Sequence, residues 1–194
     1  MKALRLLLGV AILWASPVFA AQITFFANLT GPGESPPNTS TGTGFADVIF
    51  DSTAETLRVI VSFSGLTTPG TTASHIHCCV LPPDAVGVAT TVPTFPGFPL
   101  GVTSGTYDQT FNLLLPDTYN PAFVTANGGT VASAEAALTA GLLSGTTYLN
   151  IHTTQFPGGE IRGFLEPVPE PATMLLAGFA LTGLVLQHRL RRRS

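Results

Sequence analysis

The side chains best suited to chemistry lie in two short stretches of this 194-residue chain. The first, Ser74 to Cys79, reads Ser-His-Ile-His-Cys-Cys and holds two of the four histidines and both cysteines. If it is a strand, successive side chains alternate between its two faces, so His75, His77 and Cys79 share one face. Two imidazoles at this spacing can bind one metal ion.

The second stretch, Tyr148 to Thr153, supplies a third histidine. In a strand, Tyr148, Asn150 and His152 point to one face, away from the apolar side chains between them. If the two histidine strands pair, three nitrogen ligands converge, which suits zinc or copper with an open fourth position. The predicted metal ligands are His75, His77 and His152. The alternative is that these histidines are structural and hydrogen-bond to loops or backbone carbonyls.

Cys78 and Cys79 are adjacent, so they cannot form an ordinary disulfide between distant parts of the chain. Neighbouring α-carbons lie about 3.8 Å apart, below the usual range for a disulfide. Three states remain open in an oxidising compartment: a strained vicinal disulfide, a link to another chain, or two free thiols.

Other catalytic signatures are missing from the sequence, which has no Gly-x-Ser-x-Gly nucleophile turn and no phosphate-binding loop. Glu160 and Arg162 are two residues apart on a predicted strand, so they share a face. We expect them to form an ion pair at the surface or rim of the domain.

Short strands separated by Pro- and Gly-rich turns position these residues. One convincing helix is predicted, over 130–143, while 116–129 is expected to be irregular. The pattern predicts an all-β fold, an antiparallel Greek-key sandwich or barrel with one short helix. The predicted strands cover 22–29, 42–50, 55–64, 74–80, 86–91, 105–115, 148–153 and 160–165.

Both ends of the chain are predicted to be targeting segments, flanking a β domain over 21–166. Residues 1–20 have a positive start, an apolar run and small residues at the end, as in a secretory signal peptide. A membrane-spanning helix is the alternative there, but the apolar run is about half the roughly 20 residues that a bilayer requires. Near the other end, an apolar transmembrane helix is predicted over 172–187, followed by a basic tail.

The charge of the middle segment differs from that of the whole chain. Between Ala21 and Glu166 there are ten acidic residues, two arginines and no lysine, a net charge of −8. Such an acidic domain is unsuited to nucleic acid or to anionic lipid.

The last 27 or so residues resemble the PEP-CTERM sorting signal. The resemblance rests on a proline-rich motif, then the apolar helix, then an arginine cluster that forms a basic anchor. It implies a Gram-negative bacterium, export through the inner membrane by way of signal peptidase, processing by an exosortase-type protease, and release or surface attachment, often alongside exopolysaccharide in a surface matrix. A permanent anchor is the alternative. The motif residues are Val168, Pro169, Glu170 and Pro171, and the cluster is Arg189, Arg191, Arg192 and Arg193.

Residues 22–165 resemble the CHRD domain, first described in chordin, through three motifs in order: Ala73 to His77, Gly141 to Thr153, and Pro157 to Gly163. The resemblance implies an all-β extracellular module of undefined biochemical role. The growth-factor-binding repeats of chordin are not in this sequence, so that activity is not implied.

We therefore expect an exported or cell-surface β-sandwich module with a binding or extracellular-matrix role, holding zinc or copper at the three-histidine site. The alternative is a copper- or zinc-dependent secreted oxidoreductase, which would resemble copper/zinc superoxide dismutase only at the level of the fold.

Overall fold

A computed structural model describes residues 22–169 of the chain. The predicted signal peptide, the predicted transmembrane helix and the basic tail lie outside these residues, as do Glu170 and Pro171. The strands are β1 (Gln22–Thr30), β2 (Thr43–Asp51), β3 (Thr56–Ser64), β4 (Thr71–Cys78), β5 (Gly105–Asn112), β6 (Thr147–Thr153), β7 (Ile161–Phe164) and β8 (Glu166–Pro167).

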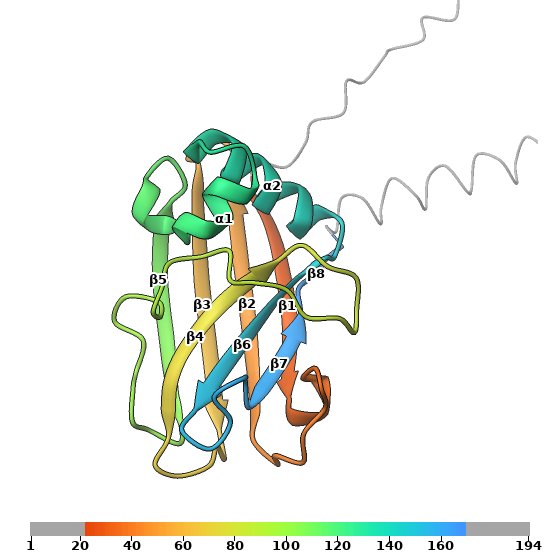
Figure 1. Cartoon of the computed structure of the whole chain (residues 1–194), viewed down its shortest axis with the longest axis vertical. Helices are drawn as coiled ribbons and strands as arrows, with labels where there is room; N and C mark the ends of the chain where they lie inside the picture. The colour runs from red at the N-terminus through yellow and green to blue at the C-terminus, as the bar shows by residue number, and fades with distance from the viewer. Residues whose placement is uncertain (1–21, 170–194) are drawn as a thin grey trace, which may run out of the picture.

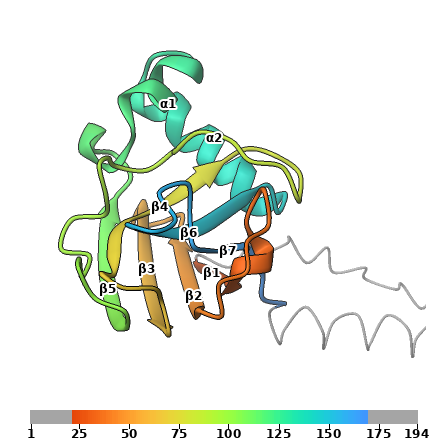
Figure 2. The ribbon, with the colours of Figure 1, turned by 60° about the horizontal axis from the view of Figure 1, so that its bottom comes forward.

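The strands form a sheet with the order β4-β6-β7-β1-β2-β3-β5, and β8 pairs with β1. Every pairing is antiparallel. The sheet curls so that β4 and β6 cross in front of β1, β2 and β3 (Figure 1). Seen from below, the two parts form two layers (Figure 2). The predicted fold class is confirmed, with the layers of a sandwich formed by one half-barrel sheet.

Alternating side chains build the core between these layers. On β3 one face is fully or nearly fully buried, and Arg58 lies exposed on the other face. The buried side chains are Leu57, Val59, Val61 and Phe63. Ile76 of β4 and Ile151 of β6 close the core from the opposite layer. Since neighbours in a strand point to opposite faces, the histidines of β4 and β6 must point outward.

Two α-helices cover one end of the sheet, α1 (Pro121–Ala126) and α2 (Val131–Leu143) (Figure 1). The predicted helix is α2, which Thr130 caps through a reciprocal pair of bonds with Ser133. The prediction that 116–129 is irregular was wrong at α1. Asn120 caps this helix and Pro121 begins it, a combination that favours a helix start.

The strand predicted over 86–91 is absent from the structure, which has only isolated bridges in this segment, His77 to Val88 and Thr90 to Tyr119. The segment instead runs along the edge of β4, where the backbone N–H groups of Ala89 and Thr90 both donate to the carbonyl of Ile76. The backbone of Val86 bonds to side chains. Two amides sharing one carbonyl cannot form a regular ladder.

Short 3-10 helices, η1 (Gly31–Gly33) and η2 (Pro116–Thr118), punctuate the loops. Within residues 22–169, no helix is long and apolar enough to cross a membrane.

Candidate metal centre

The pairing of β4 with β6 brings the three histidines together. In this register His75 lies opposite Asn150 and His77 lies opposite Tyr148, while His152 lies opposite Ala73. One ring nitrogen from each histidine lies within 4.8 Å of those of the other two. The sequence-predicted ligands therefore form one cluster, on the outer face of the sheet.

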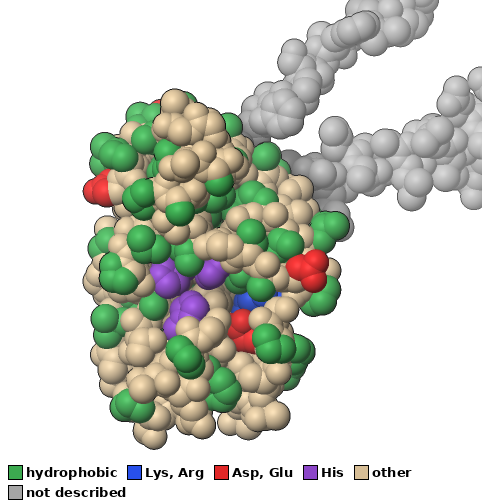
Figure 3. Space-filling view, in the orientation of Figure 1, with side chains coloured by type: hydrophobic (Ala, Val, Ile, Leu, Met, Phe, Trp, Pro, Cys, Tyr) green, Lys and Arg blue, Asp and Glu red, His purple; other side chains and the backbone are tan. Residues whose placement is uncertain are grey.

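The cluster is recessed in the surface of the domain. His75 and His77 are buried, at 6% and 7% exposure, and His152 is half-buried. Figure 3 shows histidine side chains gathered in a hollow on one face of the domain, beside an acidic and a basic group. The rings therefore border this hollow, whereas Nδ1 of His75 and Nε2 of His152 are themselves buried.

Each imidazole donates one N–H to a backbone carbonyl. Nε2 of His75 lies 2.7 Å from the Pro93 oxygen, and Nδ1 of His77 lies 2.7 Å from that of Val86. Nδ1 of His152 lies 2.9 Å from the Pro157 oxygen. A carbonyl only accepts, so in each contact the ring nitrogen carries the proton.

These bonds leave one unprotonated nitrogen on each neutral ring: Nδ1 of His75, Nε2 of His77 and Nε2 of His152. Nδ1 of His75 and Nε2 of His152 are buried and have no hydrogen-bond partner among the described residues. Nε2 of His77 faces Oδ1 of Asn150 at 3.1 Å, another acceptor in this orientation of the amide. Two of the three lone pairs thus lack any partner among residues 22–169, and the third, at Nε2 of His77, contacts only the Asn150 amide.

Burial keeps these rings neutral. Desolvation lowers the pKa of His75 and of His77 to about 4, against a weaker raising effect of the carbonyl bonds. The pKa of His152 is lowered for the same reason. Neutral imidazole is the form that binds a metal ion.

Neighbouring side chains fix His77. Its ring stacks on Tyr148 with centroids 4.6 Å apart, and the Tyr148 hydroxyl donates to the same Val86 carbonyl that His77 uses. The Tyr148 ring also contacts Arg162, whose guanidinium lies 4.5 Å from the centre of that ring. This stack of cation, phenol and imidazole leaves the ring little freedom to rotate.

The expected ion pair between Glu160 and Arg162 was wrong. Both side chains are buried. The loops after β1 and β4 cover Arg162, and the loops after β1 and β3 cover Glu160. Arg162 lies 3.8 Å from a Glu34 oxygen and donates to three carbonyls, those of Gly33, Pro83 and Asp84. Glu160 instead accepts hydrogen bonds from three hydroxyls, of Ser40, Thr67 and Thr153.

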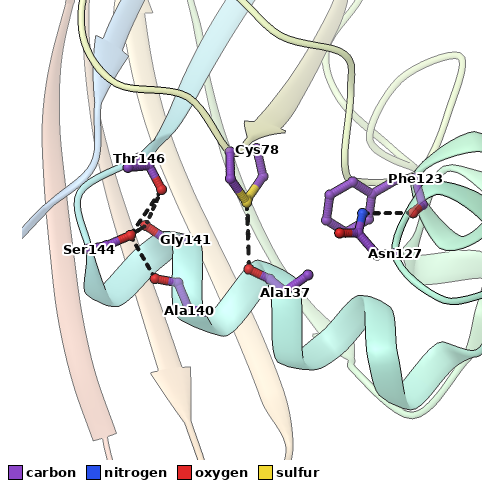
Figure 4. The surroundings of a disulfide bond; sticks show 9 residues. Cys78, Phe123, Asn127, Ala137, Ala140, Gly141, Ser144 and Thr146 are labelled. Atoms are coloured by element: carbon purple, nitrogen blue, oxygen red, sulfur yellow. Dashed lines mark hydrogen bonds between the residues drawn. A yellow bond between two sulfur atoms is a disulfide. The ribbon is translucent and has the colours of Figure 1, made fainter.

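A disulfide joins Cys78 to Cys79, and no free cysteine is found among the described residues. Figure 4 shows this disulfide above α2, where Ala137 and Gly141 face it. The predicted alternation does not extend to Cys79, because β4 ends at Cys78 and the chain turns toward the helix. The disulfide is therefore not part of the histidine cluster.

The comparison with protein families matches residues 25–165 to the CHRD domain. The chain belongs to the CHRD domain family. Residues 167–193 match the PEP-CTERM protein-sorting motif, so this CHRD domain is followed by a signal that implies export and an exosortase-type sorting machinery. No match to the chain was found among curated proteins or among solved structures.

Sequence reasoning missed Glu34 as part of the site of this CHRD domain, and it placed Arg162 only in an ion pair with Glu160. Alternation did place Asn150 on the histidine face, and that was the one available signal. Glu34 lies in a Pro- and Gly-rich loop more than 100 residues before β7, so nothing in its local sequence connects it to Arg162.

Proposed function

We propose that this CHRD domain is an exported surface module that binds one zinc or copper ion through His75, His77 and His152. The observation that carries the proposal is the set of three carbonyl bonds around one cluster. They leave the second nitrogens of His75 and His152 without a partner among the described residues, and that of His77 facing only Asn150. A merely structural histidine would use its second nitrogen as well.

The spacing of the cluster fits a first-row transition metal. Three nitrogens bound to a tetrahedral ion at about 2.1 Å lie about 3.4 Å from one another. The three nitrogens here lie within 4.8 Å, so small ring movements bring them into coordination. The carbonyls of Pro93, Val86 and Pro157 would then be the outer partners that orient metal-bound imidazoles.

The electrostatic surroundings also support a cation at this site. The segment between Ala21 and Glu166 carries a net charge of −8, and a divalent ion relieves part of that repulsion. Neutral imidazoles suit zinc or copper better than calcium or magnesium, which require oxygen ligands.

Three protein ligands leave a fourth position, and its use separates two functions. In a binding module, a donor from a partner or matrix molecule fills the position. In an oxidoreductase, the position takes a small oxygen species and the bound ion is copper. The hollow beside the histidines suits either function, and the three ring contacts are neutral carbonyls with no ionised acid or base, which favours binding.

In this proposal the sorting segments set where the site works. Signal peptidase removes residues 1–20. The 172–187 helix first holds the chain in the inner membrane, and an exosortase-type protease then cuts the chain. The mature domain then lies at the surface or in an exopolysaccharide matrix.

Loading the metal-free full chain with copper or with zinc, and measuring superoxide removal for each form, tests the choice between the two functions. The binding role predicts that neither form accelerates removal above the rate of a His77→Ala control treated with the same metal. A copper-dependent acceleration that the His77→Ala variant lacks would instead establish the oxidoreductase.

A further inference from the structure

A second concave site lies beside the histidines, between residues 34–38 and 155–159, with a cavity of about 250 Å³. The two loops are tied together, since the Asn38 amide donates to the carbonyls of Gly159 and Glu160. The Ser40 hydroxyl adds a bond to the Glu160 carboxylate. The walls of the cavity are therefore held in place before any ligand arrives.

The side chain of Glu34 lines this cavity, and one of its carboxylate oxygens accepts no hydrogen bond from the described residues. The side chain is only 5% exposed, yet its Oε1 has no hydrogen-bond partner among the described residues. A buried acceptor without a donor costs free energy, and an occupant that donates to it recovers that cost. Oε1 is thus a buried acceptor at the cavity wall that has no donor among the described residues.

The chain makes room for this carboxylate with a glycine. A Cβ on Gly159 would collide with the Glu34 carboxylate, and the φ of Gly159 is +131°, which side-chain-bearing residues rarely adopt. At the preceding Gly158, a Cβ would meet nothing within 4 Å. The loop therefore accommodates the carboxylate at one of two neighbouring glycines.

The charges of the site favour an uncharged ligand. Arg162 lies 3.8 Å from the other oxygen of Glu34, and this ion pair already balances the carboxylate. An ammonium group at Oε1 would approach the guanidinium, whereas a hydroxyl group donates without adding charge. The half-buried Phe156 ring and the prolines at 36, 37 and 157 supply the apolar walls against which the C–H face of a sugar packs.

The cavity and the histidine cluster share a wall. Pro157 lines the cavity, and its carbonyl accepts the Nδ1–H of His152. Asn150 connects the two from the other side, because its side chain hydrogen-bonds to Glu34 and faces His77. A ligand in the cavity lies next to the histidines without needing them.

We infer that this cavity is a carbohydrate subsite, in which a sugar hydroxyl donates to Oε1 of Glu34 and the ring packs on Phe156. The small volume limits the occupant to about one sugar ring, since sites for larger ligands begin near 300 Å³. The subsite stands apart from the metal proposal, because none of its contacts uses an imidazole lone pair.

Titration of the ¹⁵N-labelled full chain, stripped of metal, with glucose, galactose and mannose tests this inference. We expect at least one of the three to shift the amide signals of 34–38 and 155–159, with a Kd of about 1 mM. At pH 8, where Glu34 with its pKa of about 7 is largely ionised, Glu34→Gln should weaken that binding about tenfold or more, because the charge-assisted bond is lost. Gly159→Ala should abolish it, and Gly87→Ala, which lies outside the cavity and has space for a Cβ, should leave it unchanged.

No shift with any of the three sugars would overturn the inference and leave ordered water as the partner of Oε1. Equal affinity in the Glu34→Gln variant would overturn it too. If Gly159→Ala does not fold, Glu34→Gln against Gly87→Ala decides the matter. Because the chain is metal-free throughout, a failed metal site leaves this result untouched.

Discussion

Three backbone carbonyls decide the chemistry of the histidine cluster at the scale of single residues. Each holds the proton of one ring on the outward nitrogen, so the inward nitrogens of His75, His77 and His152 remain bare. Burial adds to this by lowering the pKa of each ring. The cluster thus offers neutral nitrogen atoms to a cation, and it is poorly suited to proton transfer near neutral pH.

The lowered pKa values predict a stability that falls with acidification in the metal-free chain. A histidine whose pKa drops from 6.5 to about 4 on folding contributes stability above pH 6.5 that is lost as the pH falls toward 4. Glu34 acts in the opposite sense, because burial raises its pKa from 4.5 to about 7 and its contribution is lost as the pH rises toward 7. The two effects partly cancel between pH 4.5 and 6.5.

Removing the Glu34 effect should therefore expose that of the histidines. In a Glu34→Gln variant, we expect the free energy of unfolding to fall more steeply from pH 6.5 to 4.5 than in the unaltered chain. Urea unfolding at a series of pH values measures the two slopes. Identical slopes would show that Glu34 titrates at an ordinary pKa in the folded protein.

At the scale of elements, the domain is held together where loops and helices meet the outer layer of the sheet. The Cys78–Cys79 disulfide rests on α2 at a glycine in the helix interior, and both sulfurs face the Ala137 carbonyl. A glycine there costs helix stability of about 1 kcal/mol relative to alanine. The close approach of the two sulfurs explains why an otherwise unfavourable residue occupies the position.

Gly141→Ala should consequently destabilise the domain despite its better helix propensity. The new Cβ would collide with Sγ of Cys78 and lie 2.8 Å from Sγ of Cys79, and overpacking of this kind costs about 1–3 kcal/mol. Thermal unfolding measures the effect. In a chain that also carries Cys78→Ala and Cys79→Ala, most of the penalty should vanish, and a penalty of the same size there would mean that the disulfide is not what Gly141 accommodates.

The two arginines of the domain allow the same substitution to be made at a buried position, Arg162, and at an exposed one, Arg58. Arg162→Met should lower the free energy of unfolding by about 3 kcal/mol, because it leaves Glu34 buried without its opposite charge and takes the donor from three carbonyls. Arg58→Met should have little effect, since its ion pair with Asp108 is about half exposed. Equal effects of the two substitutions in denaturant unfolding would contradict the larger structural role assigned to Arg162.

Local patterns predicted most of the elements but few of the contacts between them. Alternation placed β1, β2, β3 and β6 to within about two residues, because each has one face on the core. It could not place 82–98, whose backbone bonds partly to side chains of β4 and β6. The convergence of the three histidines was predictable from spacing plus strand pairing, whereas Glu34 reaches the site only through a long-range loop contact.

The whole molecule combines an acidic CHRD domain with a sorting motif that directs it out of the cytoplasm. The roles of the two chain ends, which lie beyond the described residues 22–169, stay predictions. They can be tested without reference to any ligand.

Cell fractionation should find the chain outside the cytoplasm and shortened at both ends. Glu170→Ala changes the centre of the Pro-Glu-Pro motif, so we expect a longer form that stays in the membrane fraction. Glu166→Ala provides the control, because Glu166 is exposed and precedes the matched motif. Normal processing of the Glu170→Ala variant, or intact chain in the cytoplasm, would contradict the predicted route.

Metal analysis of the purified full chain after equilibration with zinc or copper is the most direct test of the histidine centre. We predict one bound ion per chain, a large loss of binding in His75→Ala, His77→Ala and His152→Ala alike, and no change in His188→Ala, which alters the histidine of the basic tail. Substoichiometric metal that is the same in all four variants would show that the three imidazoles do not form a metal site.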